Sequence, residues 1–373
     1  MLAVTPTRLP PWPAPCSVPG SGSALYQKSG SPSSKIFRRS DSSAAIFTAW
    51  RCRRTERNST HREAVMTENA TLTHQDDEGR VKMVDVGRKQ STSRMALTFA
   101  SMFAGEKVVE LLTAGELAKG DAWAASRVAA IMAAKKTSEL IPLTHPIRLD
   151  SVRVDLFAWG KERIGCFASA AGFDRTGVEM EAMVAASTAM LNMYDMVKGV
   201  DKGAYIEQTR LVYKTGGKSG DWLSAAAQTG HIEKLATSRG KGTPKDPCDE
   251  AVLKVNFGLE SDAHGGDWHR QVSLLGVESI EKMRSKGLDV DFGSFAENIA
   301  TSGVCLYELP IGTLMWCESG PVMQVTQIGK ECHTKCAVYH RAGDCVMPRE
   351  GIFTIVLAGG RIAAGERFIT LRV

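Results

Sequence analysis

Residues 151–199 read SVRVDLFAWGKERIGCFASAAGFDRTGVEMEAMVAASTAMLNMYDMVKG, and this stretch decides the fold class. Apolar and polar residues alternate over 151–158, a spacing that predicts a half-buried strand. A second strand is expected over 163–171, and the run from 178 to 198, which ends at Gly199, predicts a long helix. Helices beside an antiparallel or mixed sheet indicate an α+β fold.

The flanking segments continue this pattern. Asp121 precedes an Ala-rich run, and aspartate is a preferred N-cap, so a helix is predicted from Asp121 to Thr137. A third strand is expected over 205–214. The loop at 214–220, KTGGKSG, is rich in glycine, but Val212 stands where a P-loop needs its first glycine. The loop is therefore not a Walker motif, and it fits both a phosphate cradle and a flexible surface loop.

His145 lies in the segment 135–146, KKTSELIPLTHP, between two prolines that limit its backbone freedom. Pro142 fixes its own φ, and Pro146 disfavours helical angles at the residue before it. This rigid placement suits an imidazole that contacts a substrate. It also suits a structural turn with a hydrogen-bonded histidine.

The long helix carries acidic residues at both of its ends. Asp195 and Lys198 are three residues apart and share one face, which suits either a stabilising ion pair or a general acid/base pair. Glu181 precedes Asp195 by fourteen residues, so the two lie within about 40° in azimuth but roughly 21 Å apart along the helix axis. If both contact one substrate, a second copy of the helix must lie antiparallel across a two-fold axis, which predicts an oligomer.

The composition limits the class of protein. The chain has 373 residues, of which 43% are hydrophobic and 23% charged, and it has room for two domains. Residues 1–65 hold ten of the 46 Lys and Arg and three of the 41 Asp and Glu, which leaves 36 against 38 elsewhere, a net charge of −2. Neither a nucleic-acid partner nor a membrane span is expected, since no apolar run is long enough to cross a bilayer. Nine irregularly spaced cysteines indicate a reducing compartment and no disulfide framework.

Residues 1–70 are expected to be disordered, because Pro, Ser and Arg are abundant and acidic residues are scarce. Seven of the 14 prolines fall in the first 32 positions. The segment suits a transit peptide, which implies the mitochondrial matrix or a plastid, or a mis-assigned start with translation beginning at Met66, which implies the cytoplasm. We favour the second hypothesis. Codons for Arg62 and Glu63 that cannot form a ribosome-binding sequence would contradict it.

Five motifs within residues 72–222 occur in the order found in one enzyme family. They are MVDV at 83–86, SELIPLTHP at 138–146, TGVEMEA at 176–182, YDMVK at 194–198 and KSGDW at 218–222. Together they resemble cyclic pyranopterin monophosphate synthase, the MoaC family of molybdenum cofactor biosynthesis.

This resemblance implies a ferredoxin-like α+β domain over 71–223, in a homohexamer built from dimers with active sites at the dimer interfaces. The implied lyase reaction converts 3′,8-cyclo-7,8-dihydroguanosine triphosphate to cyclic pyranopterin monophosphate, releases pyrophosphate and requires no cofactor. Asp195 is implied as the acid/base residue and Lys198 as its partner. The family usually has Cys where this chain has Thr144, which argues against a thiolate nucleophile there. The implied substrate contacts are Leu143, Thr144, His145, Met180, Glu181, Lys119, Lys135 and Lys214.

The C-terminal region shows a different pattern. Strand-like runs at 253–256, 322–327 and 367–373, with one helix over 275–286, predict a mostly β, barrel-like domain. Several Cys and His residues there are soft metal ligands, but their spacing is not that of a standard zinc finger. A zinc site and buried free cysteines are therefore both open. The residues are Cys332, His333, Cys336, His340 and Cys345, with His264 and His269 upstream.

Residues 235–373 resemble the MOSC domain, named for the C-terminal region of molybdenum cofactor sulfurases. The motifs are GLESDAH at 258–264, FAENI at 295–299 and QIGKEC at 327–332. The family cysteine maps onto Cys332, which the resemblance implies as a sulfur carrier or molybdenum ligand. It also implies that this domain binds the molybdenum cofactor, and it leaves binding of pyridoxal phosphate open.

The combined interpretation is a bifunctional protein, with the Ala-rich residues 224–234 as the linker between its two halves. The N-terminal half is a lyase, and the C-terminal half binds, sulfurates or delivers the molybdenum cofactor, with other molybdenum cofactor enzymes as partners. One alternative is a carrier that binds a nucleotide or pterin without turnover. Another is a MOSC-based reductase of N-hydroxylated compounds, which depends on an external electron donor.

Overall fold

The computed structural model describes residues 78–373 apart from 219, 241–244 and 331–343. The expectations for residues 1–70 and for a start at Met66 fall outside the described residues, as does Cys332.

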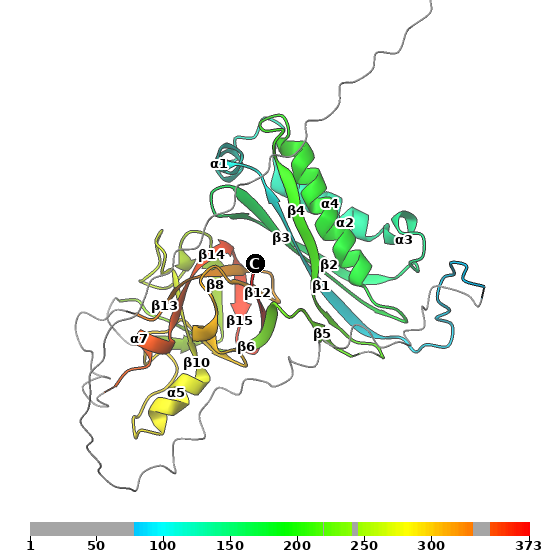
Figure 1. Ribbon diagram of the computed structural model, residues 1–373. Helices are drawn as coiled ribbons and strands as arrows, with labels where there is room; N and C mark the ends of the chain where they lie inside the picture. Colours follow the sequence, from blue (N-terminus) through cyan, green and yellow to red (C-terminus); the bar gives the residue numbers. More distant parts are fainter. Residues whose placement is uncertain (1–77, 219, 241–244, 331–343) are drawn as a thin grey trace, which may run out of the picture. The chain divides into compact units, whose positions relative to one another are not determined.

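The N-terminal part of the described chain is a five-stranded antiparallel sheet with helices on one face (Figure 1). The strand order is β2-β3-β1-β4-β5, and the first four strands and the helices follow one another as βαββαβ, a split arrangement of the ferredoxin-like type. The strands are β1 (Thr92–Phe103), β2 (Leu149–Trp159), β3 (Arg163–Asp174), β4 (Tyr205–Thr215) and β5 (Trp222–Leu223). The helices are α1 (Glu106–Ala114), α2 (Ala122–Ala134), α3 (Thr137–Leu140) and α4 (Glu179–Val197).

Small side chains let α2 and α4 pack closely on each other and on the sheet. Ala130 and Ala134 of α2 and Ala185, Ala186 and Ala189 of α4 are buried in one hydrophobic cluster. The Oδ1 atom of Asp121 accepts a hydrogen bond from the backbone N–H of Ala124 at 2.9 Å, which confirms the predicted N-cap of α2. The expected helix 178–198 and the strands over 151–158, 163–171 and 205–214 are likewise confirmed as α4, β2, β3 and β4.

Strand β1 was not predicted, although it lies at the centre of the sheet between β3 and β4. Its residues Ala96–Met102 are all buried. A strand that is buried on both faces shows no alternation of polar and apolar residues, so the period-2 signal is absent.

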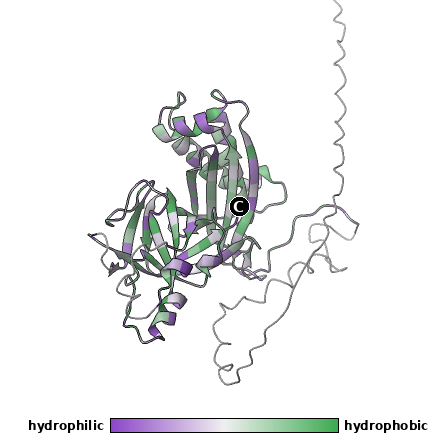
Figure 2. Cartoon of the chain, turned by 60° about the vertical axis from the view of Figure 1, so that its left-hand side comes forward, coloured by the Kyte–Doolittle hydropathy of each residue, from purple (hydrophilic) through white to green (hydrophobic). Residues whose placement is uncertain are grey.

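The C-terminal part is a closed barrel, which confirms the barrel-like prediction. Seven strands follow the order β11-β10-β14-β13-β12-β16-β6, and pairing between β11 and β6 closes the ring, with β7 added beside β6. A separate small sheet has the order β15-β8-β9. Hydrophobic positions, green in Figure 2, run along the strands beside purple hydrophilic ones.

The elements of this part are short. Its barrel strands are β6 (Ala227–Thr237), β7 (Asp246–Cys248), β10 (Val272–Gly276), β11 (Ile299–Ser302), β12 (Leu314–Cys317), β13 (Val322–Ile328), β14 (Ile352–Ala358) and β16 (Arg367–Leu371). The small sheet holds β8 (Glu250–Lys254), β9 (Gly258–Leu259) and β15 (Gly360–Ala363), and the helices are α5 (Val277–Arg284), η1 (Leu306–Glu308) and α7 (Met347–Glu350).

Part of the expected linker lies in a strand. Residues 227–234, placed in the linker because of their neighbouring alanines, belong to strand β6, where Ala227, Gly230 and Ile232 are buried. Pairing of β6 with β11 and β16 gives these residues ladder partners that no local pattern reveals. The division of the chain into domains stays a prediction.

Candidate active site

A carboxylate held between two ammonium groups lies at the C-terminal end of α4. Asp195 Oδ1 is 2.6 Å from Lys198 Nζ, and Asp195 Oδ2 is 3.0 Å from Lys119 Nζ. Lys119 comes from the segment between α1 and α2, so the tertiary fold adds a second cation to the predicted pair. Lys198 first, and Lys119 with it, lower the pKa of Asp195, and Asp195 in turn raises the pKa of Lys198. The cluster is half exposed and therefore open to a ligand.

The N-terminal end of α4 holds a second acidic group in a different environment. Only 3% of Glu181 is exposed, and its Oε2 atom has no hydrogen-bond partner among the residues that the structure describes. Burial, helped by the charge of Glu179, raises the pKa of Glu181 to about 7, although a helix N-terminus by itself favours the ionised form. Glu179 is paired with Lys214, whose Nζ lies 2.8 Å from Oε1. Met180, between the two acids, is 36% exposed.

The segment that carries His145 follows helix α3, which packs against α4. Thr144 Oγ1 donates a hydrogen bond to the carbonyl oxygen of Ile141 at 2.8 Å, so the hydroxyl helps to close the turn before His145. Leu143, Thr144 and His145 are all half-buried. Lys135 caps the C-terminus of α2 and is exposed.

The glycine-rich loop after β4 adopts a backbone that only glycine tolerates well. Gly216 and Gly217 have φ values of +89° and +83°. A Cβ atom at Gly216 would overlap the carbonyl oxygen of Ser93, and one at Gly217 would overlap the guanidinium of Arg94. The loop is therefore packed against the start of β1. Arg94 was missed by the sequence analysis because β1 itself was missed.

One copy of the chain keeps these groups in two sets. The structure brings Lys119, Asp195 and Lys198 together, and it brings Lys214 to the acidic N-terminus of α4. The two sets lie at opposite ends of a 19-residue helix, roughly 21 Å apart for a separation of fourteen residues. Their burial also differs, since Glu181 is buried and the side chain of Asp195 is 55% exposed. Glu181 and Asp195 therefore lie in different environments, although they are expected to share one face of the helix.

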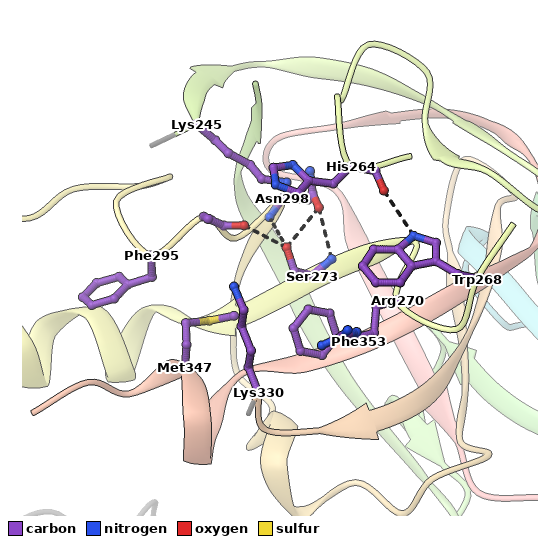
Figure 3. Close-up of a pocket in the computed structure, with 11 residues that line it drawn as sticks. Lys245, His264, Trp268, Arg270, Ser273, Phe295, Asn298, Lys330, Met347 and Phe353 are labelled. Carbon is purple, nitrogen blue, oxygen red and sulfur yellow. Dashed lines mark hydrogen bonds between the residues drawn. The ribbon is translucent and has the colours of Figure 1, made fainter. Parts of the chain in front are cut away.

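The barrel contains a pocket of about 120 Å³. Aromatic and basic side chains dominate its lining (Figure 3). The lining residues are Lys245, His264, Trp268, Arg270, Ser273, Phe295, Ala296, Asn298, Lys330, Met347 and Phe353.

A buried carboxylate organises one wall of this pocket. Asp262 Oδ2 accepts hydrogen bonds from Lys245 Nζ at 2.8 Å and from Asn298 Nδ2 at 2.9 Å, and Oδ1 lies 3.0 Å from His264 Nδ1. Burial by itself would raise the pKa of Asp262, but Lys245 and backbone N–H donors lower it below its ordinary value. Burial lowers the pKa of Lys245 in spite of this partner. The ionised carboxylate thus fixes both basic side chains at the pocket wall.

The N-terminal part of the chain matches a family model, and curated proteins resemble it closely. Residues 83–217 match the MoaC family. Cyclic pyranopterin monophosphate synthase of Novosphingobium aromaticivorans is 49% identical over 154 residues, which cover 41% of this chain and 98% of that protein. This chain belongs to the MoaC family. Cyclic pyranopterin monophosphate synthase 2 of Mycobacterium tuberculosis is 48% identical over 151 residues, covering 40% of this chain and 90% of that protein.

A second family model matches the barrel. Residues 260–368 match the MOSC domain. Two solved structures share features with the chain at low similarity: the YuaD protein of Bacillus subtilis, 18% identical with a TM-score of 0.35, and YiiM of Geobacillus stearothermophilus, 17% identical with a TM-score of 0.30. They cover 39% and 38% of this chain, and 98% and 75% of their own chains. No conclusion about this chain rests on these two likenesses.

The two histidines that were considered as metal ligands upstream in the MOSC part have other partners. His264 hydrogen-bonds Asp262, and His269 Nε2 lies 3.0 Å from Gln327 Oε1. Within the described residues no three His, Cys, Asp or Glu side chains group into a metal site. Cys332 and the ligands that follow it at 333, 336 and 340 lie outside the described residues. None of the described helices is long and apolar enough to cross a membrane.

Proposed function

We propose that the MoaC half is a lyase of molybdenum cofactor biosynthesis that converts 3′,8-cyclo-7,8-dihydroguanosine triphosphate to cyclic pyranopterin monophosphate and releases pyrophosphate. The observation that carries this proposal is the Asp195 carboxylate between Lys119 and Lys198. The names of relatives at 48–49% identity support the same reaction.

The arrangement suits a reaction that moves protons around a highly charged substrate. Asp195, as a carboxylate, is proposed to accept a proton, and Lys198, as an ammonium group 2.6 Å away, to donate one. Lys119, Lys135 and Lys214 are the lysines expected near the triphosphate or the reacting ring, and Arg94, beside the glycine-rich loop, is proposed to add a further cation. The rearrangement and the closure of a cyclic phosphate are redox neutral, so we propose that this half needs no redox cofactor.

The complete site is proposed to form between two copies of the chain. One copy contributes the N-terminal end of α4 with His145 and Lys214, and the other contributes Lys119, Asp195 and Lys198. An isologous dimer places these ends of the two helices beside each other and makes two equal sites. Association of three such dimers gives the hexamer that the family resemblance implies.

The test is a turnover assay of the purified chain with the cyclised nucleotide. Asp195→Asn removes the carboxylate charge with little change of shape, and we expect turnover to fall roughly 10²–10⁴-fold. Glu110→Gln is the matched control, because Glu110 is an exposed carboxylate of α1 whose ion-pair partner among the described residues is Lys107 at 3.6 Å. Full turnover by Asp195→Asn would contradict the assignment, and substrate binding without product from the unchanged protein would favour a nucleotide carrier.

For the MOSC half we propose binding of the molybdenum cofactor, with Cys332 as the sulfur carrier or molybdenum ligand. Basic residues and aromatic rings around the barrel pocket support this, because they suit an anionic group attached to a flat heterocycle. The bound cofactor would supply molybdenum and sulfur chemistry, while the barrel side chains hold and orient it. Delivery to other molybdenum enzymes and a cytoplasmic location belong to the same proposal.

The molybdenum content of the purified protein tests this second function. We expect metal in the unchanged protein and its loss in Cys332→Ala. Metal retained in that variant would contradict ligation by Cys332. Reduction of an N-hydroxylated compound with an added electron donor would favour the reductase alternative.

A further inference from the structure

The glycine-rich loop after β4 is held by the carboxylate that follows it. Gly216 and Gly217 have φ values of +89° and +83°, and glycine gives the backbone so much freedom that such a loop does not keep one shape by itself. Asp221 stands after the loop and directly before strand β5. Its side chain accepts three hydrogen bonds from the end of β4 and the start of the loop.

The donors to this carboxylate lie on both sides of Lys214. Asp221 Oδ1 accepts the hydroxyl of Thr215 at 2.5 Å and the backbone N–H of Gly216 at 3.3 Å. Its Oδ2 atom accepts the hydroxyl of Tyr213 at 3.1 Å. These donors, with the Thr215 hydroxyl first, lower the pKa of Asp221, so the group is a carboxylate at neutral pH and accepts all three bonds.

The loop is also packed on Arg94 of strand β1. A Cβ atom at Gly217 would overlap the guanidinium of Arg94, so the backbone of the loop lies directly on this side chain. Arg94 donates from Nε to the carbonyl oxygen of Asp174 at 3.1 Å and from Nη2 to that of Arg175 at 3.2 Å. Both carbonyls belong to the chain that leads from β3 to α4. The shape of the loop is therefore coupled to the N-terminal end of α4.

The functional residue that these contacts fix is Lys214. It lies between two of the donors to Asp221, and its Nζ is 2.8 Å from Glu179 Oε1 at the start of α4. Within the described residues β5 pairs with β4 at two positions, one of which joins Lys214 to Trp222 (Figure 1). A ladder of two residues fixes the end of β4 weakly, so the contacts of Asp221 have a large share in placing Lys214.

The contacts of Asp221 are local to one hairpin. Its side chain is exposed, and its three donors lie five to eight positions earlier in the chain. A group of this kind stabilises a surface loop and not the hydrophobic core. Its removal is therefore expected to change the loop and to leave the fold intact.

We propose that Asp221 is a positioning residue of the lyase reaction, which holds the loop in the shape that directs Lys214 toward the phosphates of the substrate. It acts through Lys214 and transfers no proton itself. A negative charge beside a triphosphate repels it, so the hydrogen-bond geometry of Asp221 and not its charge explains its place in the loop. The inference rests on the proposed function of the MoaC half for the identity of the substrate.

The experiment compares Asp221→Ala with Asp221→Asn in the full chain. Alanine removes all three acceptor contacts, whereas the Oδ1 atom of asparagine still accepts from Thr215 and Gly216 without the charge. We expect Asp221→Ala to raise the KM for the cyclised nucleotide about tenfold with little change of kcat, because phosphate contacts are lost equally in the ground state and the transition state. Asp221→Asn should restore most of this loss.

Calorimetry with pyrophosphate, the product released in the proposed reaction, measures the same effect without turnover. Because other parts of the chain carry cations of their own, the signal of interest is the difference between variants. Asp221→Ala should bind pyrophosphate about tenfold more weakly than the unchanged protein. Lys214→Met should also weaken binding, and adding Asp221→Ala to Lys214→Met should have little further effect, because the two residues act as a unit.

Asp291→Ala is the matched control. Asp291 is an exposed carboxylate that likewise accepts a backbone N–H, from Phe292 at 2.8 Å, but it belongs to the C-terminal barrel part of the chain. This variant should keep the KM and the pyrophosphate affinity of the unchanged protein, and thermal unfolding establishes that each variant is folded. Thr215→Val removes one donor and keeps the shape of the side chain, so it should raise KM in the same direction by a smaller factor.

Three results would overturn the positioning role. The first is equal KM and equal pyrophosphate affinity in folded Asp221→Ala and Asp291→Ala. The second is an Asp221→Asn variant as defective as Asp221→Ala, because the charge would then be required. The third is a full additional loss from Asp221→Ala in the Lys214→Met protein, because Asp221 would then not act through Lys214.

Failure of this inference is distinguishable from failure of the lyase function. Turnover by the unchanged protein, with an unaltered KM in Asp221→Ala, leaves the proposed function standing and overturns the positioning role. No turnover by the unchanged protein, with pyrophosphate binding weakened in Asp221→Ala and restored in Asp221→Asn, contradicts the lyase and supports the role of Asp221 in placing Lys214.

Discussion

Glu181 and Asp195 are two acids on one helix whose pKa values are moved in opposite directions. Asp195 is exposed beside two ammonium groups and stays ionised, whereas Glu181 is buried and has a pKa of about 7. Near neutral pH Glu181 is therefore populated in both protonation states, so it can donate or accept a proton during turnover. Pairs of acids with separated pKa values are typical of acid/base sites.

The raised pKa of Glu181 predicts the direction in which stability changes with pH. The folded-state pKa of Glu181 is raised, so the folded chain binds more protons than the unfolded chain between the ordinary pKa of 4.5 and about 7. The free energy of unfolding therefore falls as pH rises through this window, by about 3 kcal/mol in total. Glu181→Gln cannot ionise and should lack this loss.

Chemical unfolding of both proteins at several pH values measures the effect. The unchanged protein and Glu181→Gln should differ least near pH 4.5, and the variant should be increasingly more stable up to pH 7, with a constant difference above it. Glu139→Gln, which alters an exposed carboxylate of α3 beside Lys136, is the control and should follow the unchanged protein. A difference that does not depend on pH would mean that Glu181 does not titrate near neutrality.

Local sequence patterns could identify only some residues of the candidate site. The pair of Asp195 and Lys198 follows from helical spacing alone and is present at 2.6 Å. Lys119 was matched through family resemblance only, since no spacing rule links residues 76 positions apart. Arg94 and Arg270 were missed because each acquires its neighbours through strand pairing or ring stacking across the fold.

At the scale of elements, the packing of α2 on α4 depends on alanines that face each other. Ala130 is completely buried in the cluster between these helices and the sheet. Ala130→Leu adds volume where none is free, and we expect a loss of about 1–3 kcal/mol of stability. Ala124→Leu makes the same change on the exposed side of α2 and should have little effect. Urea unfolding of the two variants checks this, and equal midpoints would mean that the helix contact is loose.

Sequence patterns predicted the elements that bury one face or begin at a clear cap residue. Strand β2 exposes Arg153 between the more buried Val152 and Val154, and α2 begins at an aspartate N-cap. Strand β1 has no such signature because seven of its residues in a row are buried. The closure of the barrel by β6 and β11 joins residues more than sixty positions apart, and no local pattern contains that pairing.

At the scale of the whole molecule, the two ends of α4 become one site only if two copies combine them. The proposed division into half-sites predicts that defects at opposite ends complement each other in mixed oligomers. Asp195→Asn damages the C-terminal half-site and Glu181→Gln the N-terminal one, and each variant alone should have little activity. A mixed dimer places both defects in one site and leaves the other site intact.

Differently tagged Asp195→Asn and Glu181→Gln chains, produced together and mixed at random, should recover about a quarter of the turnover of the unchanged protein, because that share of sites combines two intact halves. The matched control mixes Asp195→Asn with Lys198→Met. Both of these defects lie in the same half-site, so every site of every mixed oligomer is damaged and no activity should return. Recovery in neither mixture would mean that each copy of the chain carries its own complete site. Recovery in the control as well would mean that Asp195 and Lys198 do not belong to the same half-site.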